Sequence, residues 1–393
     1  MILIKMLSRN FFNRKSDPSK DPLDDCDVSM ESVEQENHDE SLMEDEASKI
    51  DELQKMIDQL QVRLKEAESE NQNVRMKLEV ERFGISRFSS DPDLIKFYTG
   101  FRSYNEFRGL FLFLEPVAKT MASHYYVSAT SESSMAGKPR SMLLIDDFFL
   151  FLCRLRVGLK TKDLAVRFST SPSSVSRKVI TWANLLYNVL GRIPIWLPKE
   201  NIQSLLPPSF KELFPNTRVI IDCCEIQIQQ PSSLAANSQL YSHYKGRTTL
   251  KCLVGIAPHG ALTFISPLYS GSMSDVEITR VSGLIDLLEP GDEVMADKGF
   301  TIKQLVAQKH ASLTIPNFLR SKKQFTPEEI SENEKIASVR IHVERYIRRI
   351  KEYKLFDTVL PLSLVGTAPQ LWTIAGILAN FQGPLIKDVN EME

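Results

Sequence analysis

The sequence predicts an α/β protein in which a mixed sheet flanked by helices follows an all-α segment. Alternating and continuous apolar runs at 217–229 and 250–271 are typical of strands, and the second of them reads as a hairpin. Beyond them, another short strand at 293–297 stands among segments of helical periodicity. These helical segments lie at 275–288, at 302–309 and, longest, from Pro327 to about Tyr353.

The N-terminal part of the chain is set apart by its charge. Residues 16–48 contain thirteen Asp/Glu and one Lys, a local net charge of −12, whereas the remaining residues carry a net charge of +10. Because an acidic segment almost without aromatic residues is typical of disorder, residues 1–46 are predicted to form a disordered acidic tail. The basic remainder indicates a nucleic-acid partner, although such charge also serves to solvate a surface.

Residues 47–83 are predicted to form a coiled coil. Apolar residues recur at heptad spacing along two seam positions, which begin at Ile50 and Leu53, and Asn71 interrupts the first seam once. β-Branched and leucine seam residues with a single seam Asn favour two parallel strands, so we expect a homodimer through residues 49–82. The alternative is a single amphipathic helix that packs on its own domain.

The next segments are predicted to be helical. Residues 84–140 combine an aromatic-rich stretch, expected to lie in a core, with a linker at 130–140. Residues 141–192 show the pattern of a helix-turn-helix DNA-binding domain, whose last helix opens with Ser171 as N-cap and Pro172 at its first position. The alternative is a three-helix subdomain with a solvated basic face.

The start of that last helix provides the DNA-binding candidates of this domain. Short polar side chains are expected to reach base edges, and basic side chains to neutralise phosphates. The candidates are Ser173, Ser174, Ser176, Arg177 and Lys178.

Carboxylates mark the predicted strands and the long helix. Asp222 follows three apolar residues inside the first strand, and Asp297 ends the short strand in "GDEVMADKGF". A charge in an apolar strand is costly without a partner, and if these two strands are neighbours, both carboxylates converge at one edge of the sheet. Glu344, with Arg340 and Lys351 on the same helix face, supplies a third. Three carboxylates suit two Mg²⁺ or Mn²⁺ ions about 4 Å apart that clamp a phosphodiester, although each acid alone also suits a cap or a salt bridge.

The cysteines indicate neither zinc nor disulfides. Five scattered Cys, with no CxxC pair, argue against a zinc finger and against a secreted framework, and favour a reducing compartment. Cys223 and Cys224 are interpreted as small strand residues, because Mg²⁺ prefers oxygen ligands.

Two terminal segments bear on location. The uncharged stretch 358–386 is long enough to span a membrane, but prolines interrupt it and residues 373–381 are expected to form a buried core helix, so no membrane partner is predicted. The basic, apolar start at 1–16 leaves a weak mitochondrial presequence as an alternative location.

The ordered motifs together resemble a known family. "IDCCEI", "YSHYKGRTTLKCLVGIAPHG", "ALTFISPLYSGSMSDVEI", "GDEVMADKGF" and "RIHVERYIRRIKEYK" resemble, in this order, the DDE superfamily endonuclease domain of Harbinger-like transposases. The segment before them resembles the helix-turn-helix that accompanies this domain, so the resemblance covers about residues 141–385. It implies a ribonuclease-H-like fold at 216–386, metal-dependent cleavage and joining of DNA, and a nuclear location.

The resemblance also assigns residues. It places the catalytic, metal-binding carboxylates at Asp222, Asp297 and Glu344, with Mg²⁺ or Mn²⁺ as cofactor. Arg340 and Lys351 match basic positions around the catalytic Glu of related bacterial transposases, whereas the Tyr of that signature falls at Ala337. The DNA-binding candidates of this domain are Lys245, Lys298, Arg340, Arg345 and Lys351. Asp275 matches another acid common to the family and is an accessory candidate, expected to cap the following helix, with metal or DNA contact as the alternative.

One departure from the family keeps two functions open. Relatives of the THAP-associated subtype carry a zinc finger, whose Cys/His ligands are absent here. Either the helix-turn-helix and the basic surface suffice, or a DNA-binding partner protein supplies specificity, or the chain is a truncated or host-adopted copy. The intact acid triad favours an active transposase-like nuclease. The missing finger favours a catalytically silent, host-adopted DNA-binding regulator.

Overall fold

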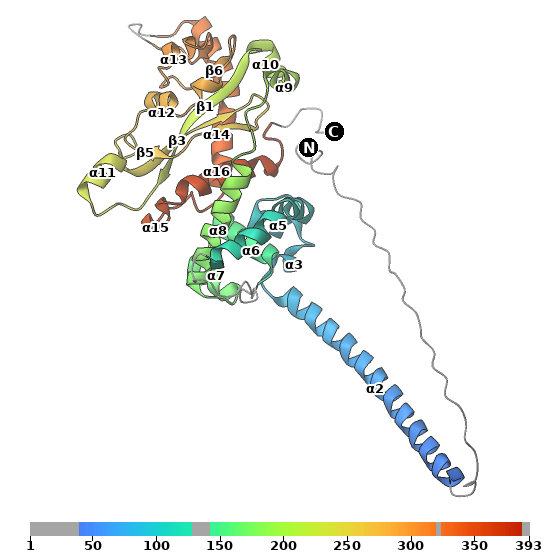
Figure 1. The fold of residues 1–393 in the computed structure, drawn as a ribbon. Coiled ribbons are helices and arrows are strands. Elements are labelled where there is room, and N and C mark those ends of the chain that lie inside the picture. The colour runs from blue at the N-terminus through green and yellow to red at the C-terminus, as the bar shows by residue number, and fades with distance from the viewer. Residues whose placement is uncertain (1–38, 128–141, 320–323, 387–393) are drawn as a thin grey trace, which may run out of the picture. The chain divides into compact units, whose positions relative to one another are not determined.

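The computed structural model describes residues 39–127, 142–319 and 324–386 (Figure 1). The chain divides into two units, Met1–Arg82 and Phe83–Glu393, and each is described by itself. The predicted linker at 130–140 and the acidic tail before Asp39 lie outside the described residues.

The first unit contains one long helix, α2, which runs from Asp39 to Glu81. It therefore begins within the segment predicted to continue as an acidic tail to residue 46. Acidic residues in the first turns of a helix are stabilised by its dipole, which accounts for the earlier start. The seam leucines are exposed on this helix: Leu53 is 58% exposed and Leu64 is 60% exposed.

The second unit begins with a helical part that ends in the helix-turn-helix. Its elements are α3 (Ile85–Phe88), α4 (Pro92–Thr99), α5 (Tyr104–Val127), α6 (Leu144–Leu152), a π-helical turn (Cys153–Val157), α7 (Thr161–Arg167) and α8 (Pro172–Leu190). Most aromatic side chains of this part lie in the core, as expected, although Phe97 and Phe113 are exposed. Phe83 makes edge contacts with Phe88 and Phe168 at centroid distances of 5.4 and 5.2 Å.

The helix-turn-helix contains the predicted helices, with a glycine after the first and a serine cap before the last. The chain leaves the first helix at Gly158, whose φ of 76° lies in the left-handed region that glycine adopts without strain. Ser171 caps α8, because its hydroxyl accepts the Ser174 backbone N–H at 3.2 Å, and Pro172 occupies the first helical position. Four residues, 168–171, separate α7 from α8, one more than the three-residue turn that the sequence predicts, because α7 ends at Arg167 rather than at Phe168.

The sheet is mixed, as predicted. Its order is β2-β3-β1-β6-β7, with β4 and β5 also pairing with β3. β1 and β3 are antiparallel, as are β3 and β4, whereas β6 and β7 run parallel to β1. This arrangement confirms the expected ribonuclease-H-like sheet. The strands are β1 (Thr217–Gln227), β2 (Tyr241–Ser242), β3 (Arg247–Ile256), β4 (Leu262–Ile265), β5 (Tyr269–Ser270), β6 (Glu293–Met295) and β7 (Ser312–Thr314).

Helices cover both faces of the sheet (Figure 1). Because side chains alternate along a strand, Ile220 and Ile226 of β1 pack into the core that includes α14 (Pro327–Lys351) and α16 (Ala368–Ala379). Val219 and Ile221 pack into the opposite core with α12 (Asp275–Val281) and α13 (Lys303–Ala307).

The remaining helices are short. The predicted helix 275–288 stops at Val281, since Gly283 adopts a φ of 85°, and a 3₁₀ turn follows at Ile285–Leu287. Sequence patterns missed several others, namely α9 (Lys199–Ser204), α10 (Pro208–Leu213), α11 (Leu234–Leu240), α15 (Leu362–Val365) and a final 3₁₀ turn (Asn380–Gln382). Among the described helices, none is long and apolar enough to cross a membrane.

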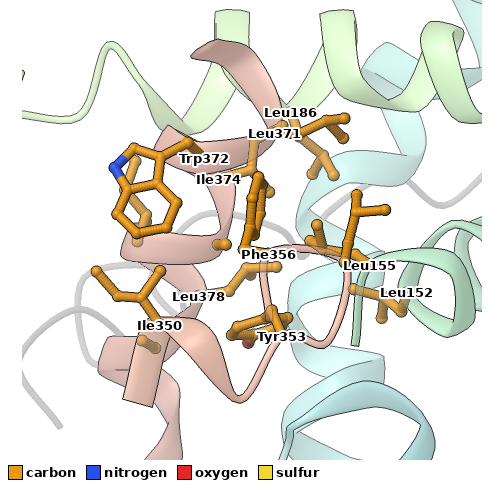
Figure 2. Close-up of a cluster of buried hydrophobic side chains, with 14 of the residues drawn as sticks. Leu152, Leu155, Leu186, Ile350, Tyr353, Phe356, Leu371, Trp372, Ile374 and Leu378 are labelled. Atoms are coloured by element: carbon orange, nitrogen blue, oxygen red, sulfur yellow. The ribbon is translucent and has the colours of Figure 1, made fainter. Parts of the chain in front are cut away.

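The helix-turn-helix and the sheet share one core. Leu152, Leu155 and Leu186 of the former meet residues of α14, α16 and the intervening segment (Figure 2). Backbone hydrogen bonds join the two parts, because the N–H of Lys354 donates to the Arg156 carbonyl at 2.9 Å and that of Leu355 to the Leu155 carbonyl at 3.3 Å. The helix-turn-helix is therefore fixed on the sheet by a shared core and backbone hydrogen bonds.

Candidate active site

The two strand carboxylates stand side by side. In the parallel pair of β1 and β6, Ile220 lies opposite Met295. Asp222 and Asp297 each follow two residues later, so both side chains project at the same level beyond the β6 end. Asp297 lies in the turn directly after β6, where its carbonyl accepts the Phe300 N–H at 3.0 Å.

The third acid comes from the long helix. α14 packs on β1 and β3 through its apolar stripe, which includes Val339 and Val343. Glu344 follows this stripe and is 49% exposed. One turn earlier, Arg340 pairs with Glu344 at 2.9 Å between Nη1 and Oε1, and Arg340 Nη2 lies 3.9 Å from Asp297 Oδ1. One arginine thus joins the acid of α14 to the acid that follows β6.

Asp222 is the most buried of the three carboxylates. Burial raises its pKa to about 6, although the Cys223 N–H, which donates to Asp222 Oδ1 at 2.9 Å, and the Arg340 charge both lower it. The charges of Glu344 and Asp297 raise it further. The three predicted carboxylates therefore lie close enough to influence one another electrostatically.

The donor set fits a hard divalent cation in its chemistry. Carboxylate oxygens are the ligands that Mg²⁺ and Mn²⁺ favour, and three acids sharing one arginine leave a local excess of negative charge. In the described part of the chain, no group of three His, Cys, Asp or Glu side chains is assembled closely enough to hold a metal. Asp297 and Glu344 instead contact Arg340.

The predicted phosphate-binding residues of the endonuclease-like domain differ in how far their side chains are exposed to solvent. Lys298, next to Asp297, and Arg345 on α14 are exposed. Lys245 is exposed in the turn between β2 and β3, where its Nζ lies 4.6 Å from the centre of the Tyr244 ring. Lys351 is only half-exposed and lies beside the Cys224 thiol. A hydrogen bond with Cys252 and, second to it, the Lys351 charge lower the pKa of this thiol, although burial raises it.

On the helix-turn-helix, the predicted base-reading residues are accessible. Ser173 and Ser176 are exposed at the start of α8, as is Arg177, whose guanidinium donates to the Ser174 hydroxyl at 3.3 Å. Ser174 itself is half-buried and accepts a hydrogen bond from the capping Ser171 hydroxyl at 2.9 Å.

Lys178 does not lie free for a phosphate. Its ammonium pairs with the carboxylate of Asp147, which is buried on α6. This pair was not predicted from the sequence. The signal for it was Asp147 itself, because an acid in an apolar helix needs a counter-charge, which the third helix of the motif supplies.

The expected role of Asp275 is corrected. The N-cap of α12 is Ser274, whose hydroxyl accepts the Glu277 N–H at 3.2 Å. Asp275 is the first helical residue, and its Oδ1 lies 2.7 Å from the Nζ of Lys251 on β3. Asp275 also lies near the Cys223 thiol. Burial is the main cause that raises the pKa of this thiol, and the charge of Asp275 is the next. Cys223 belongs to the core on the face opposite that of Ile220, so Asp275 lies on the far side of the sheet from α14.

Two family models that match this chain belong to one superfamily. Residues 221–380 match the family model of the DDE superfamily endonuclease, and residues 140–192 match that of the helix-turn-helix of DDE superfamily endonuclease. Among solved structures, the Mos1 transposase paired-end complex with left transposon end matches at 12% sequence identity and a TM-score of 0.19. That match covers 59% of this chain and 86% of the other, and its TM-score is too low to support a residue-level comparison. No curated protein matches.

Proposed function

We propose, from the premise that this chain carries a transposase-derived endonuclease domain of the DDE superfamily, that it cleaves DNA strands and joins them with divalent metal ions. The observation that carries the proposal is the convergence of Asp222, Asp297 and Glu344 around Arg340. Three separate elements deliver these acids, and a packed sheet does not need three carboxylates at one place for its stability.

The chain's own residues divide the work. Asp222, Asp297 and Glu344 would hold Mg²⁺ or Mn²⁺, which when bound supplies Lewis-acid activation of a phosphodiester and of its attacking oxygen. Asp222 must be deprotonated to act as a ligand, a condition met above its pKa of about 6. The exposed Lys298 and Arg345 would orient the substrate phosphates, whose charge the carboxylates repel.

The helix-turn-helix would position the duplex. Ser173 and Ser176 would read base edges from the start of α8, and Arg177 would neutralise a phosphate. Because this motif shares a core with the sheet, it presents DNA to the carboxylates at a fixed spacing. The proposal extends to a nuclear location and to a homodimer through α2. The THAP-associated subtype and a DNA-binding partner protein remain predictions.

A cleavage assay tests this function. The purified chain is incubated with supercoiled DNA and with transposon-end duplexes in Mg²⁺ or Mn²⁺, and Asp297→Asn is compared with the natural sequence. Asp286→Asn is the matched control, since Asp286 is 82% exposed and pairs with Lys309 at 3.3 Å. Loss of nicking in Asp297→Asn alone supports the proposal. Equal nicking in all three proteins contradicts it, and DNA binding without any nicking favours the silent regulator.

A further inference from the structure

We propose that Arg340 is an exchangeable counter-ion that couples metal binding to DNA binding. In the metal-free protein it neutralises Asp297 and Glu344, and when these carboxylates take a divalent cation its guanidinium turns to a DNA phosphate. The inference deepens the proposed function and rests on it.

The hold of Arg340 on the acids is partial. Its side chain is 19% exposed, and one nitrogen forms an ion pair with Glu344 at 2.9 Å while another lies 3.9 Å from Asp297, beyond normal hydrogen-bond distance. Arg340 Nε is buried without a hydrogen-bond partner among the described residues. A guanidinium carries five N–H donors, so most of its capacity is unused in this arrangement.

The positive charge of Arg340 competes with a divalent cation for the same carboxylates. Three acids influence one another here, and Arg340 is the cation that lowers the pKa of Asp222 and pairs with the other two. A dication and a guanidinium on the same carboxylates repel each other in a partly buried site, where charges interact more strongly than in water. Binding of a divalent cation to Asp297 and Glu344 therefore requires Arg340 to withdraw.

A withdrawn guanidinium suits a phosphate. Its planar donors form bidentate hydrogen bonds with phosphate oxygens, and a phosphodiester brought to the carboxylates lies within its reach. DNA then draws Arg340 off the acids and strengthens metal binding. By linkage, metal strengthens DNA binding by the same factor.

Arg345 provides a matched control on the same helix. It lies one residue beyond Glu344, is exposed, and forms no ion pair with any residue in the described ranges. Removing its charge changes the net charge of the chain by the same amount as removing that of Arg340. A difference between the two variants thus reports the exchange and not net charge.

The experiment measures Mn²⁺ binding from the electron paramagnetic resonance signal of free Mn²⁺, corrected for Mn²⁺ bound by DNA alone. The full chain, Arg340→Gln, Arg345→Gln and Asp297→Asn are titrated with and without a DNA duplex. We expect DNA to raise the Mn²⁺ affinity of the natural chain about 5- to 100-fold, a range typical of coupled sites. Arg340→Gln should bind Mn²⁺ about fivefold or more tighter without DNA, and DNA should add little.

The outcomes separate the inference from the function. If Arg340→Gln and Arg345→Gln match the natural chain without DNA while Asp297→Asn loses Mn²⁺, the exchange is overturned and the metal site stands. If Asp297→Asn binds Mn²⁺ as the natural chain does, the carboxylates are not the metal site and the proposed function fails. Arg340→Lys keeps the charge but lacks the planar bidentate donors of the guanidinium. This variant should still bind Mn²⁺ weakly without DNA and should lose most of the coupling between DNA and Mn²⁺. It also keeps the test decisive if Arg340→Gln folds poorly.

Discussion

Ile220 of β1 lies opposite Met295 of β6 in a parallel pair, and this register sets Asp222 and Asp297 level with each other. Residues of parallel strands advance in the same direction, so acids that follow the paired positions by the same number of residues lie at the same level. A shift of one residue in either strand would turn one carboxylate into the opposite core. The site thus depends on the sheet register before it depends on any side-chain contact.

The raised pKa of Asp222 predicts a pH-dependent cost to folding. Its pKa is about 6 in the folded chain and 3.8 when unperturbed, so the folded state binds more protons between these pH values. Stability from this group is present below pH 3.8 and is lost as pH rises through 6. Asp222→Asn should therefore stabilise the chain at pH 7.5 by roughly 1–3 kcal/mol, with little gain at pH 4.

Urea unfolding at the two pH values measures this difference. The control is Asp286→Asn, whose exposed carboxylate should give no pH-dependent gain. A loss of stability in Asp222→Asn at pH 7.5 would contradict the prediction, because it would mean that the carboxylate stabilises the fold as a charge.

Neighbouring basic residues on α8 should behave differently. Arg177 is exposed, so Arg177→Gln should lower the slope of log affinity for DNA against log salt by about 1 and leave unfolding unchanged. Lys178 pairs with the buried Asp147, so Lys178→Met should cost roughly 1–3 kcal/mol of stability by removing a charge partner of that acid. Salt-dependent binding and urea unfolding of both variants measure the two effects, and the reverse pattern would refute the assignment.

Sequence periodicity predicted the parts that depend on local pattern. The cap at Ser171, the stop at Gly158 and the strand around Asp222 follow from residue types within a few positions. Chemistry also suggested that Asp222 and Asp297 converge if β1 and β6 are neighbours, because a carboxylate in an apolar strand is costly without a partner.

The long-range pairings were not predictable in this way. Nothing near Arg340 in the sequence shows that it contacts Asp297 rather than a ligand, and nothing near Asp275 shows that Lys251 approaches it. Lys178 belongs to the same class, since its partner stands on another helix. Such contacts are set by how helices cross the sheet, which periodicity leaves undetermined.

The shared core predicts that the helix-turn-helix and the sheet unfold together. Leu186 of α8 is fully buried among residues that include Trp372 of α16 (Figure 2). Leu186→Ala should cost about 2–5 kcal/mol and shift the transitions of both parts equally. Single-tryptophan variants that retain Trp182 or Trp372 report the two parts by fluorescence in urea. Transitions at different urea concentrations would show that the parts unfold separately.

The last prediction concerns α2. Seam residues Leu60 and Leu64 are 56% and 60% exposed on this helix, an arrangement that a second copy would cover. In a parallel pair in register, Asn71 faces its own copy, and the heptad pattern brings Arg63 near Glu68 of the other chain on one side of that layer. On the other side Glu70 meets Arg75 in the same way. An antiparallel pair loses the Asn–Asn layer, so the sequence favours the parallel dimer.

Sedimentation equilibrium of the full chain should accordingly give a dimer. Leu60→Lys combined with Leu64→Lys places four like charges in the seam of a dimer and should yield a monomer, while the unfolding of residues 83–386 stays the same. Gln59→Lys, at an outer heptad position, is the control and should remain dimeric. Asn71→Val should strengthen the association and admit trimers, because the seam Asn restricts the oligomeric state at a cost in stability. A monomeric natural chain at tens of micromolar would leave α2 as a single helix, the alternative that the sequence kept open.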